Sequence, residues 1–302
     1  MTNIQRIAAM LLALPAVYAA ELKPETLAAW DQYIQTANLH MQRRLQPTGR
    51  FLWIDETPDL ARRVHSGEIV ASPIGERSPR KIPNGLIHHW IGAAFVSHAG
   101  LADIFAVVQA FDRYKEFYAP LVVDSKPMGR GASDFRFSMV LLNKALFSKT
   151  ALDCECKASY SRLDSKRWYS VGSSTRIRQI EDYSQPGEHE LAPDVGAGYI
   201  WRLYSLSRFE ERDGGVYIEV EAIALSRDIP VTLRWLADPI VRRVSRSSLL
   251  TSLQQTRTAV ASTAAGTVAT QSFTISAASC SRTQSSAHPS GVGAEGLRPF
   301  RH

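Results

Sequence analysis

The feature that most constrains the fold of this chain is a pair of alternating segments joined by a tight turn. Arg212-Asp213-Gly214-Gly215 has the composition of a two-residue type I′ hairpin turn, because Asp and Gly accept the positive φ angles of its two central positions. The turn fixes the pairing register of the strands predicted over Tyr199–Arg212 and Gly215–Arg227. The sequence therefore predicts a long antiparallel hairpin.

In that register the two faces of the hairpin carry different kinds of side chain. One face places Arg208 opposite Glu219, a favourable cross-strand ion pair. On the other face, large apolar residues stand at the ends and small residues at the centre. The facing pairs are Phe209 with Ile218, Ser207 with Val220, Ser205 with Ala222 and Leu203 with Ala224, and Trp201 extends the row. Small residues leave volume, so either the closing helix packs closely here or the space is a ligand cavity.

A third segment, Thr150–Arg162, alternates strictly and places Cys154 and Cys156 on the buried face of a strand. Two such thiols lie about 7 Å apart, which is too far for a relaxed disulfide. The chain has three cysteines, too few for a second pair to complete a tetrahedral metal site. We expect buried structural thiols with no metal and no cofactor; a bond to Cys280 would demand an ordered tail.

The remaining pattern gives the order of an α+β protein. An amphipathic helix is predicted from Pro24 to before Pro47. The final helix has two apolar stripes, which indicate either a kink near Ser247-Ser248 or a helix packed on both sides; we expect the second if the first helix covers its back. The other predicted elements are short strands at Phe51–Ile54 and Glu68–Ala71, a helix over Leu101–Tyr118, a closing helix over Pro239–Val260, and strands over Leu86–Val96, Asp134–Leu142, Thr150–Arg162 and Arg167–Glu181.

This order and several short stretches resemble the START-like (helix-grip, SRPBCC) superfamily of polyketide cyclases and lipid-transfer proteins. The resemblance covers about Ile87 to Val260, and its matching stretches are Trp90–Phe95, Phe111–Pro120, Arg167–Ser170, Arg208–Tyr217, Leu225–Pro230 and the closing helix. It implies a curved antiparallel sheet that grips a long C-terminal helix, with an apolar cavity between them. The small residues of the hairpin would then line that cavity.

The two ends differ from this body. Residues 1–19 combine Arg6, an apolar run and a small-residue cleavage site, which predicts a signal peptide and export to the periplasm or the medium, with no stable transmembrane segment after cleavage. Residues 261–302 are rich in Ser, Thr and Ala and predict a disordered tail. Between them we expect a helix-and-loop elaboration over 20–85 and the START-like domain over 86–260. The net charge of +6 falls to +3 without the ends, so we expect no nucleic-acid partner.

We therefore expect an exported binder or carrier of a hydrophobic, lipid-like small molecule. The candidate ligand-binding residues are Cys154, Cys156, Tyr160, Trp201, Ser205, Ser207, Phe209, Ala222 and Ala224. One alternative is a cyclase/aromatase-like enzyme in which His89 or Tyr160 moves protons, although His89 also fits a hydrogen-bonded core histidine. Another is an envelope interaction module with a filled core. The sequence leaves the ligand and the oligomeric state open.

Overall fold

A computed structural model describes residues 20–75, 78–145, 148–228 and 243–263; the predicted signal peptide and most of the predicted tail lie outside them. Residues 20–263 belong to one compact unit. Its helices are α2 (Pro24–Leu45), η1 (Trp53–Glu56), α3 (Pro58–His65), α4 (Leu101–Val108), η2 (Phe111–Arg113), α5 (Tyr114–Phe117) and a C-terminal helix over residues 243–263. None of the described helices is long and apolar enough to cross a membrane.

One large sheet organises the molecule, and every neighbouring pair in it is antiparallel. Its strand order is β2-β4-β12-β11-β8-β7-β6-β5, while β3 pairs with β4 and β9 with β8. The strands are β2 (Val70–Pro73), β3 (Arg80–Ile82), β4 (Gly85–Ser97), β5 (Val122–Arg130), β6 (Asp134–Ala145), β7 (Ser148–Arg162), β8 (Arg167–Glu181), β9 (His189–Glu190), β11 (Arg202–Arg212) and β12 (Gly215–Arg227). Two short strands, β1 (Ala20–Glu21) and β10 (Val195–Gly196), pair separately.

The predicted hairpin is confirmed pair by pair. Arg212 pairs with Gly215, and the register continues to Leu203 with Ala224. Asp213 and Gly214 have φ angles of 56° and 77°, the left-handed conformations that a type I′ turn requires. The strand predicted over Tyr199–Arg212 begins three residues later, at Arg202.

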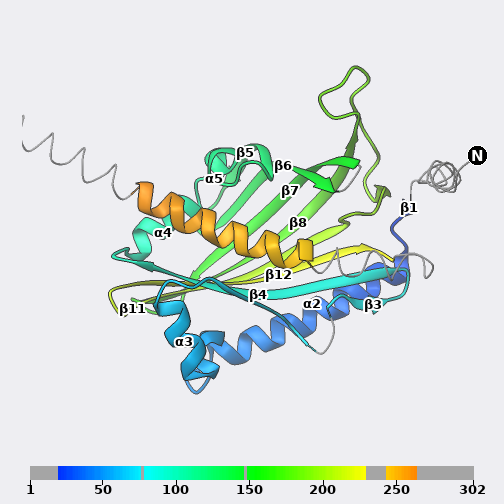
Figure 1. Cartoon of the computed structure of the whole chain (residues 1–302). Coiled ribbons are helices and arrows are strands. Elements are labelled where there is room, and N and C mark those ends of the chain that lie inside the picture. Colours follow the sequence, from blue (N-terminus) through cyan, green and yellow to red (C-terminus); the bar gives the residue numbers. More distant parts are fainter. Residues whose placement is uncertain (1–19, 76–77, 146–147, 229–242, 264–302) are drawn as a thin grey trace, which may run out of the picture. The chain divides into compact units, whose positions relative to one another are not determined.

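The C-terminal helix crosses one face of the sheet, which we call the inner face (Figure 1). Its contact with β4 depends on Gly92, where a Cβ atom would lie 2.9 Å from Leu253 Cδ1 and 3.0 Å from Leu249 Cδ2. Leu249, Leu253, Thr256 and Val260 form the buried stripe, whereas Ser247 and Thr251 are exposed. One of the two stripes in the sequence is therefore the packing surface.

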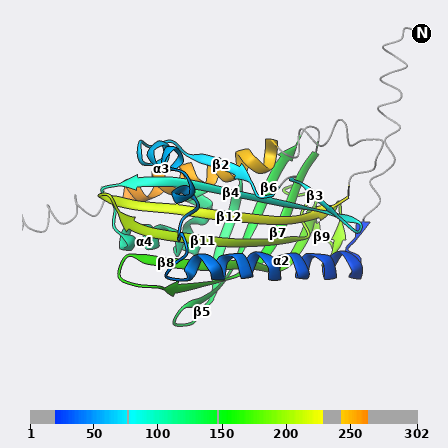
Figure 2. The same cartoon turned by 90° about the horizontal axis from the view of Figure 1, so that it is seen from below.

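Helix α2 packs on the opposite, outer face of the sheet, so the expectation that it covers the back of the C-terminal helix is wrong (Figure 2). Pro24 at its first turn and Arg43 and Arg44 in its last turn fit its two ends. Its buried side chains Trp30, Ala37 and Met41 pack on the outer residues of β4, β11 and β12. Both faces of the central strands are thus covered, and the sheet is the middle layer.

Other differences from the expected elements are local. The helix predicted over Leu101–Tyr118 is broken into α4, η2 and α5, because the backbone leaves the helical region at Ala110, where ψ is 66°. The strand expected at Phe51–Ile54 is absent, and η1 begins at Trp53. The strand expected at Glu68–Ala71 is found as β2, so the N-terminal elaboration adds strands to the same sheet.

Candidate functional site

The centre of the β11–β12 hairpin remains half-buried on its inner face. We call this the central strip: Leu203, Ser205, Ser207, Val220, Ala222 and Ala224. On the outer face of the same two strands, Leu206, Arg208 and Ile223 are at most 1% exposed. Water therefore reaches the middle of the sheet from the side of the C-terminal helix and is excluded from the side of α2.

Four candidate residues, Cys154, Cys156, Tyr160 and Phe209, are buried in the apolar cluster beside this strip. Burial raises the pKa of both thiols, that of Cys156 to about 12, so they act as small apolar groups. The Tyr160 hydroxyl donates to the Val108 carbonyl oxygen at 2.9 Å, and burial raises its pKa. These residues form an apolar wall without a free acid or base.

The two serines of the strip, unlike Tyr160, have hydroxyl groups that the described part of the chain leaves free to bond. The hydroxyl groups of Ser205 and Ser207 have no hydrogen-bond partner among the described residues. Gly172 lies directly opposite Ser205 in β8, and a Cβ atom at that glycine would lie 2.5 Å from Ser205 Oγ. The glycine thus leaves the volume that the serine hydroxyl occupies.

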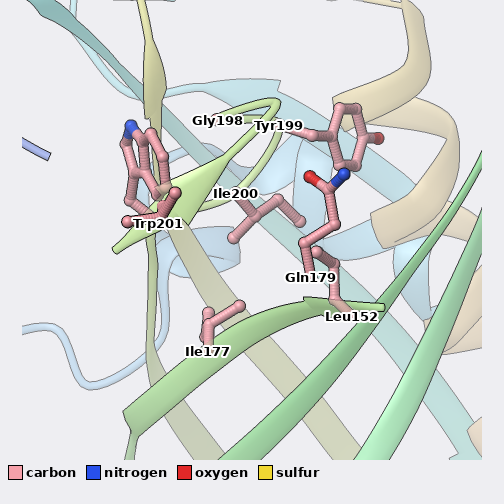
Figure 3. Close-up of a pocket in the computed structure, with 8 residues that line it drawn as sticks. Leu152, Ile177, Gln179, Gly198, Tyr199, Ile200 and Trp201 are labelled. Carbon is pink, nitrogen blue, oxygen red and sulfur yellow. The ribbon is translucent and has the colours of Figure 1, made fainter. Parts of the chain in front are cut away.

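A small pocket lies beside the end of the strip, where the loop before β11 crosses β7 and β8 (Figure 3). Its volume is about 10 Å³, about enough for one water molecule. The lining residues are Leu152, Ile177, Gln179, Val195, Gly198, Tyr199, Ile200 and Trp201. The Gln179 side chain is fixed there, because its Oε1 accepts a hydrogen bond from the Ala197 amide at 2.7 Å.

Trp201 departs from its expected place in the inner-face row. It precedes β11, and its buried ring belongs to the cluster beneath α2 with Leu206 and Leu225. It also borders the small pocket (Figure 3). The alternation that places Leu203 on the inner face does not extend to Trp201, because the strand begins between them.

The candidate proton-transfer residue His89 faces α2 on the outer side. Its Nδ1 lies 2.9 Å from the Tyr33 hydroxyl, and its Nε2 lies 3.2 Å from Glu221 Oε2. Glu221 is in turn bonded to the fully buried Arg208, which also bonds Glu219. Burial alone would raise the pKa of Glu221, but hydrogen bonds from His89 and Arg208 lower it to about 2. His89 is therefore a hydrogen-bonded core histidine.

The basic side chains of the C-terminal helix do not form one site. Arg243 and Arg246 are exposed, Arg242 lies outside the described residues, and Arg257 donates to the Gly67 carbonyl oxygen at 2.7 Å. Within the described ranges, no group of three or more His, Cys, Asp or Glu residues could hold a metal ion. Cys280 also lies outside them.

Sequence reasoning missed the unpaired polar atoms of two inner-face residues of β4. Trp90 Nε1 and His88 Nδ1 are buried and have no hydrogen-bond partner within the described part of the chain. The sequence contained part of this signal, because adjacent His88 and His89 must point to opposite sides of a strand. Their lack of partners depends on tertiary packing.

Comparisons with known proteins found no matching family model and no matching curated protein. A STAR-related lipid transfer protein fragment from Xanthomonas axonopodis is 14% identical, with 62% of this chain and 98% of that chain covered and a TM-score of 0.38. Human STARD10 is 9% identical (63% and 72% covered, TM-score 0.40), and the Zhui aromatase/cyclase from Streptomyces is 10% identical (58% and 93%, TM-score 0.34). The architecture itself, an antiparallel sheet crossed on its inner face by a C-terminal helix, is the α+β helix-grip fold that the START-like resemblance implies.

Proposed function

We propose that this protein is an exported, non-catalytic binder or carrier of an apolar small molecule, held between the central strip and the C-terminal helix. The observation that carries the proposal is the half-buried state of the strip at the middle of a sheet covered on both faces. Arg6 and the apolar segment that follows it support export.

The chemistry of the strip fits a ligand with a hydrocarbon body. Its side chains are aliphatic apart from two serine hydroxyls, and the wall beside it consists of buried aromatic rings and neutral thiols. Covering about 200 Å² of apolar surface would contribute about 5 kcal/mol, before the cost of association is subtracted. The two serine hydroxyls can bond a polar group of the ligand without leaving a buried charge.

A second candidate, an interaction module with a filled core, is favoured by the small pocket, whose 10 Å³ holds no ligand larger than water. The cyclase-like alternative has less support. Its two candidate residues already have hydrogen-bond partners within the protein. His89 is bonded to Tyr33 and Glu221 on the outer face, and the Tyr160 hydroxyl donates to a backbone carbonyl oxygen.

Titration with the neutral fluorescent probe N-phenyl-1-naphthylamine tests the proposal. We expect saturable binding to the wild type and about tenfold weaker binding to Ala222→Leu, whose larger side chain fills the strip. Lys157→Leu is the matched control, because it adds a leucine at an exposed position of β7. Equal affinity in all three proteins, or no binding to the wild type, would overturn the proposal.

A further inference from the structure

Among the residues that the structure describes, two buried polar atoms on the inner face of β4 have no hydrogen-bond partner: Trp90 Nε1 and His88 Nδ1. Their residues are 8% and 6% exposed. Unpaired polar atoms destabilise a folded interior, and the great majority of buried polar groups in proteins are paired. Two of them on one face of one strand therefore offer free hydrogen-bonding capacity to a bound molecule.

Both residues adjoin the central strip. In the β4–β12 register, Trp90 stands opposite Ala222 and His88 opposite Ala224. Because they are two residues apart on one strand, their Cα atoms are about 7 Å apart and their side chains leave the same face. The two half-buried alanines have no side chain beyond Cβ, so the strip gives access to the polar atoms from the side of β12.

The two atoms have complementary hydrogen-bonding roles. The Trp90 indole N–H can only donate. His88 Nε2 lies 2.9 Å from Ser226 Oγ, and that hydroxyl donates to the Arg227 carbonyl oxygen at 3.3 Å. On this basis we assign the His88 proton to Nε2, which donates to Ser226 Oγ, and a lone pair to Nδ1. Burial lowers the pKa of His88 to about 4, so the ring is neutral at physiological pH.

We propose that Trp90 and His88 bind the hydroxyl head group of a neutral amphipathic ligand whose hydrocarbon tail lies along the central strip. A hydroxyl oxygen accepts from Trp90 Nε1–H while its own proton is donated to His88 Nδ1. A carboxylate would face the His88 lone pair without a proton, and an ammonium group could not accept from the indole. This inference rests on the proposed function and specifies the ligand class of the same site.

Competition against bound N-phenyl-1-naphthylamine tests this with two ligands of equal chain, 1-decanol and its methyl ether. The ether can accept from Trp90 but cannot donate to His88. We expect the alcohol to bind about tenfold more tightly, the effect of one added hydrogen bond in an apolar site. In His88→Phe this preference should fall to less than about twofold.

Trp168→Phe is the matched control, because Trp168 is a partly buried inner-face residue of β8. It should keep the preference for the alcohol, whereas Trp90→Phe should weaken the binding of both ligands. A measurement independent of variant folding is the indole ¹H–¹⁵N resonance of Trp90 in the wild type, which should shift when the alcohol is added. Equal affinities for alcohol and ether, with an unmoved resonance, would overturn this inference alone. Failure of the probe to bind would overturn the proposed function.

Discussion

Replacing Arg208 by methionine would remove a cation from between two carboxylates that α2 covers. Arg208 is fully buried; its Nε lies 2.7 Å from Glu219 Oε1, and its Nη2 lies 2.5 Å from Glu221 Oε1. Methionine fills similar space without charge, so both carboxylates would lose a partner. Breaking a buried ion pair in this way costs about 3–5 kcal/mol. His89 still bonds Glu221, and the Trp53 amide still donates to Glu219, so we expect a loss near 3 kcal/mol.

Urea unfolding of wild type and variant at neutral pH measures this loss. Arg178→Met is the control, because that arginine and its two ion-pair partners, Asp153 and Glu190, are all partly exposed to solvent. We expect the control to lose less than about 1 kcal/mol of unfolding free energy. Adding Glu219→Gln and Glu221→Gln to Arg208→Met should recover part of the stability, because the unpaired charges are gone. The reasoning is refuted if Arg208→Met costs no more than the control.

Three further outcomes follow from the packing and from the titrating groups. Gly92→Ala should lower the free energy of unfolding by about 1–3 kcal/mol, because the added methyl group pushes the C-terminal helix away. Gly131→Ala, whose methyl group would meet only ordinary contacts, should stay within about 0.5 kcal/mol of the wild type; thermal unfolding measures both. Burial lowers the pKa of His88 from 6.5 to about 4 on folding, so between these pH values the unfolded chain binds more protons than the folded chain. The free energy of unfolding should therefore decrease by about 3 kcal/mol between a pH above 6.5 and pH 4. Urea unfolding at several pH values measures this slope, and His88→Phe should flatten it. Because Cys154 and Cys156 are buried and burial raises their pKa values, an alkylating reagent should modify them only in denaturant, as detected by peptide mapping. Rapid labelling of the folded protein would contradict their burial.

The β11–β12 hairpin was predictable because local chemistry decides it. Asp213 and Gly214 admit one turn type, and that turn leaves a single register in which apolar and charged residues separate by face. The alternation of β7 likewise placed Cys154 and Cys156 in the interior. By contrast, β5 carries Lys126, Pro127 and Gly129, which obscure the pattern of an edge strand, and its pairing with β6 contains two register shifts.

The burial of the outer face was not predictable from its composition. Arg208, Glu219 and Glu221 form a charged row that resembles a solvated surface, and their interior position depends on where α2 lies. The apolar positions of α2 match either side of the sheet equally well, so periodicity alone could not choose between them. The unpaired atoms of His88 and Trp90 have the same origin, since a missing partner is a property of the whole packing.

The central claim, that the inner face holds an apolar small molecule, is tested most directly by native mass spectrometry of the protein recovered from the cells that produce it. We predict a bound species that organic solvent releases and that is depleted in Ala222→Leu but retained in Lys157→Leu. A wild-type protein that has the mass of the chain alone, and that takes up neither 1-decanol nor the naphthylamine probe, would contradict the claim.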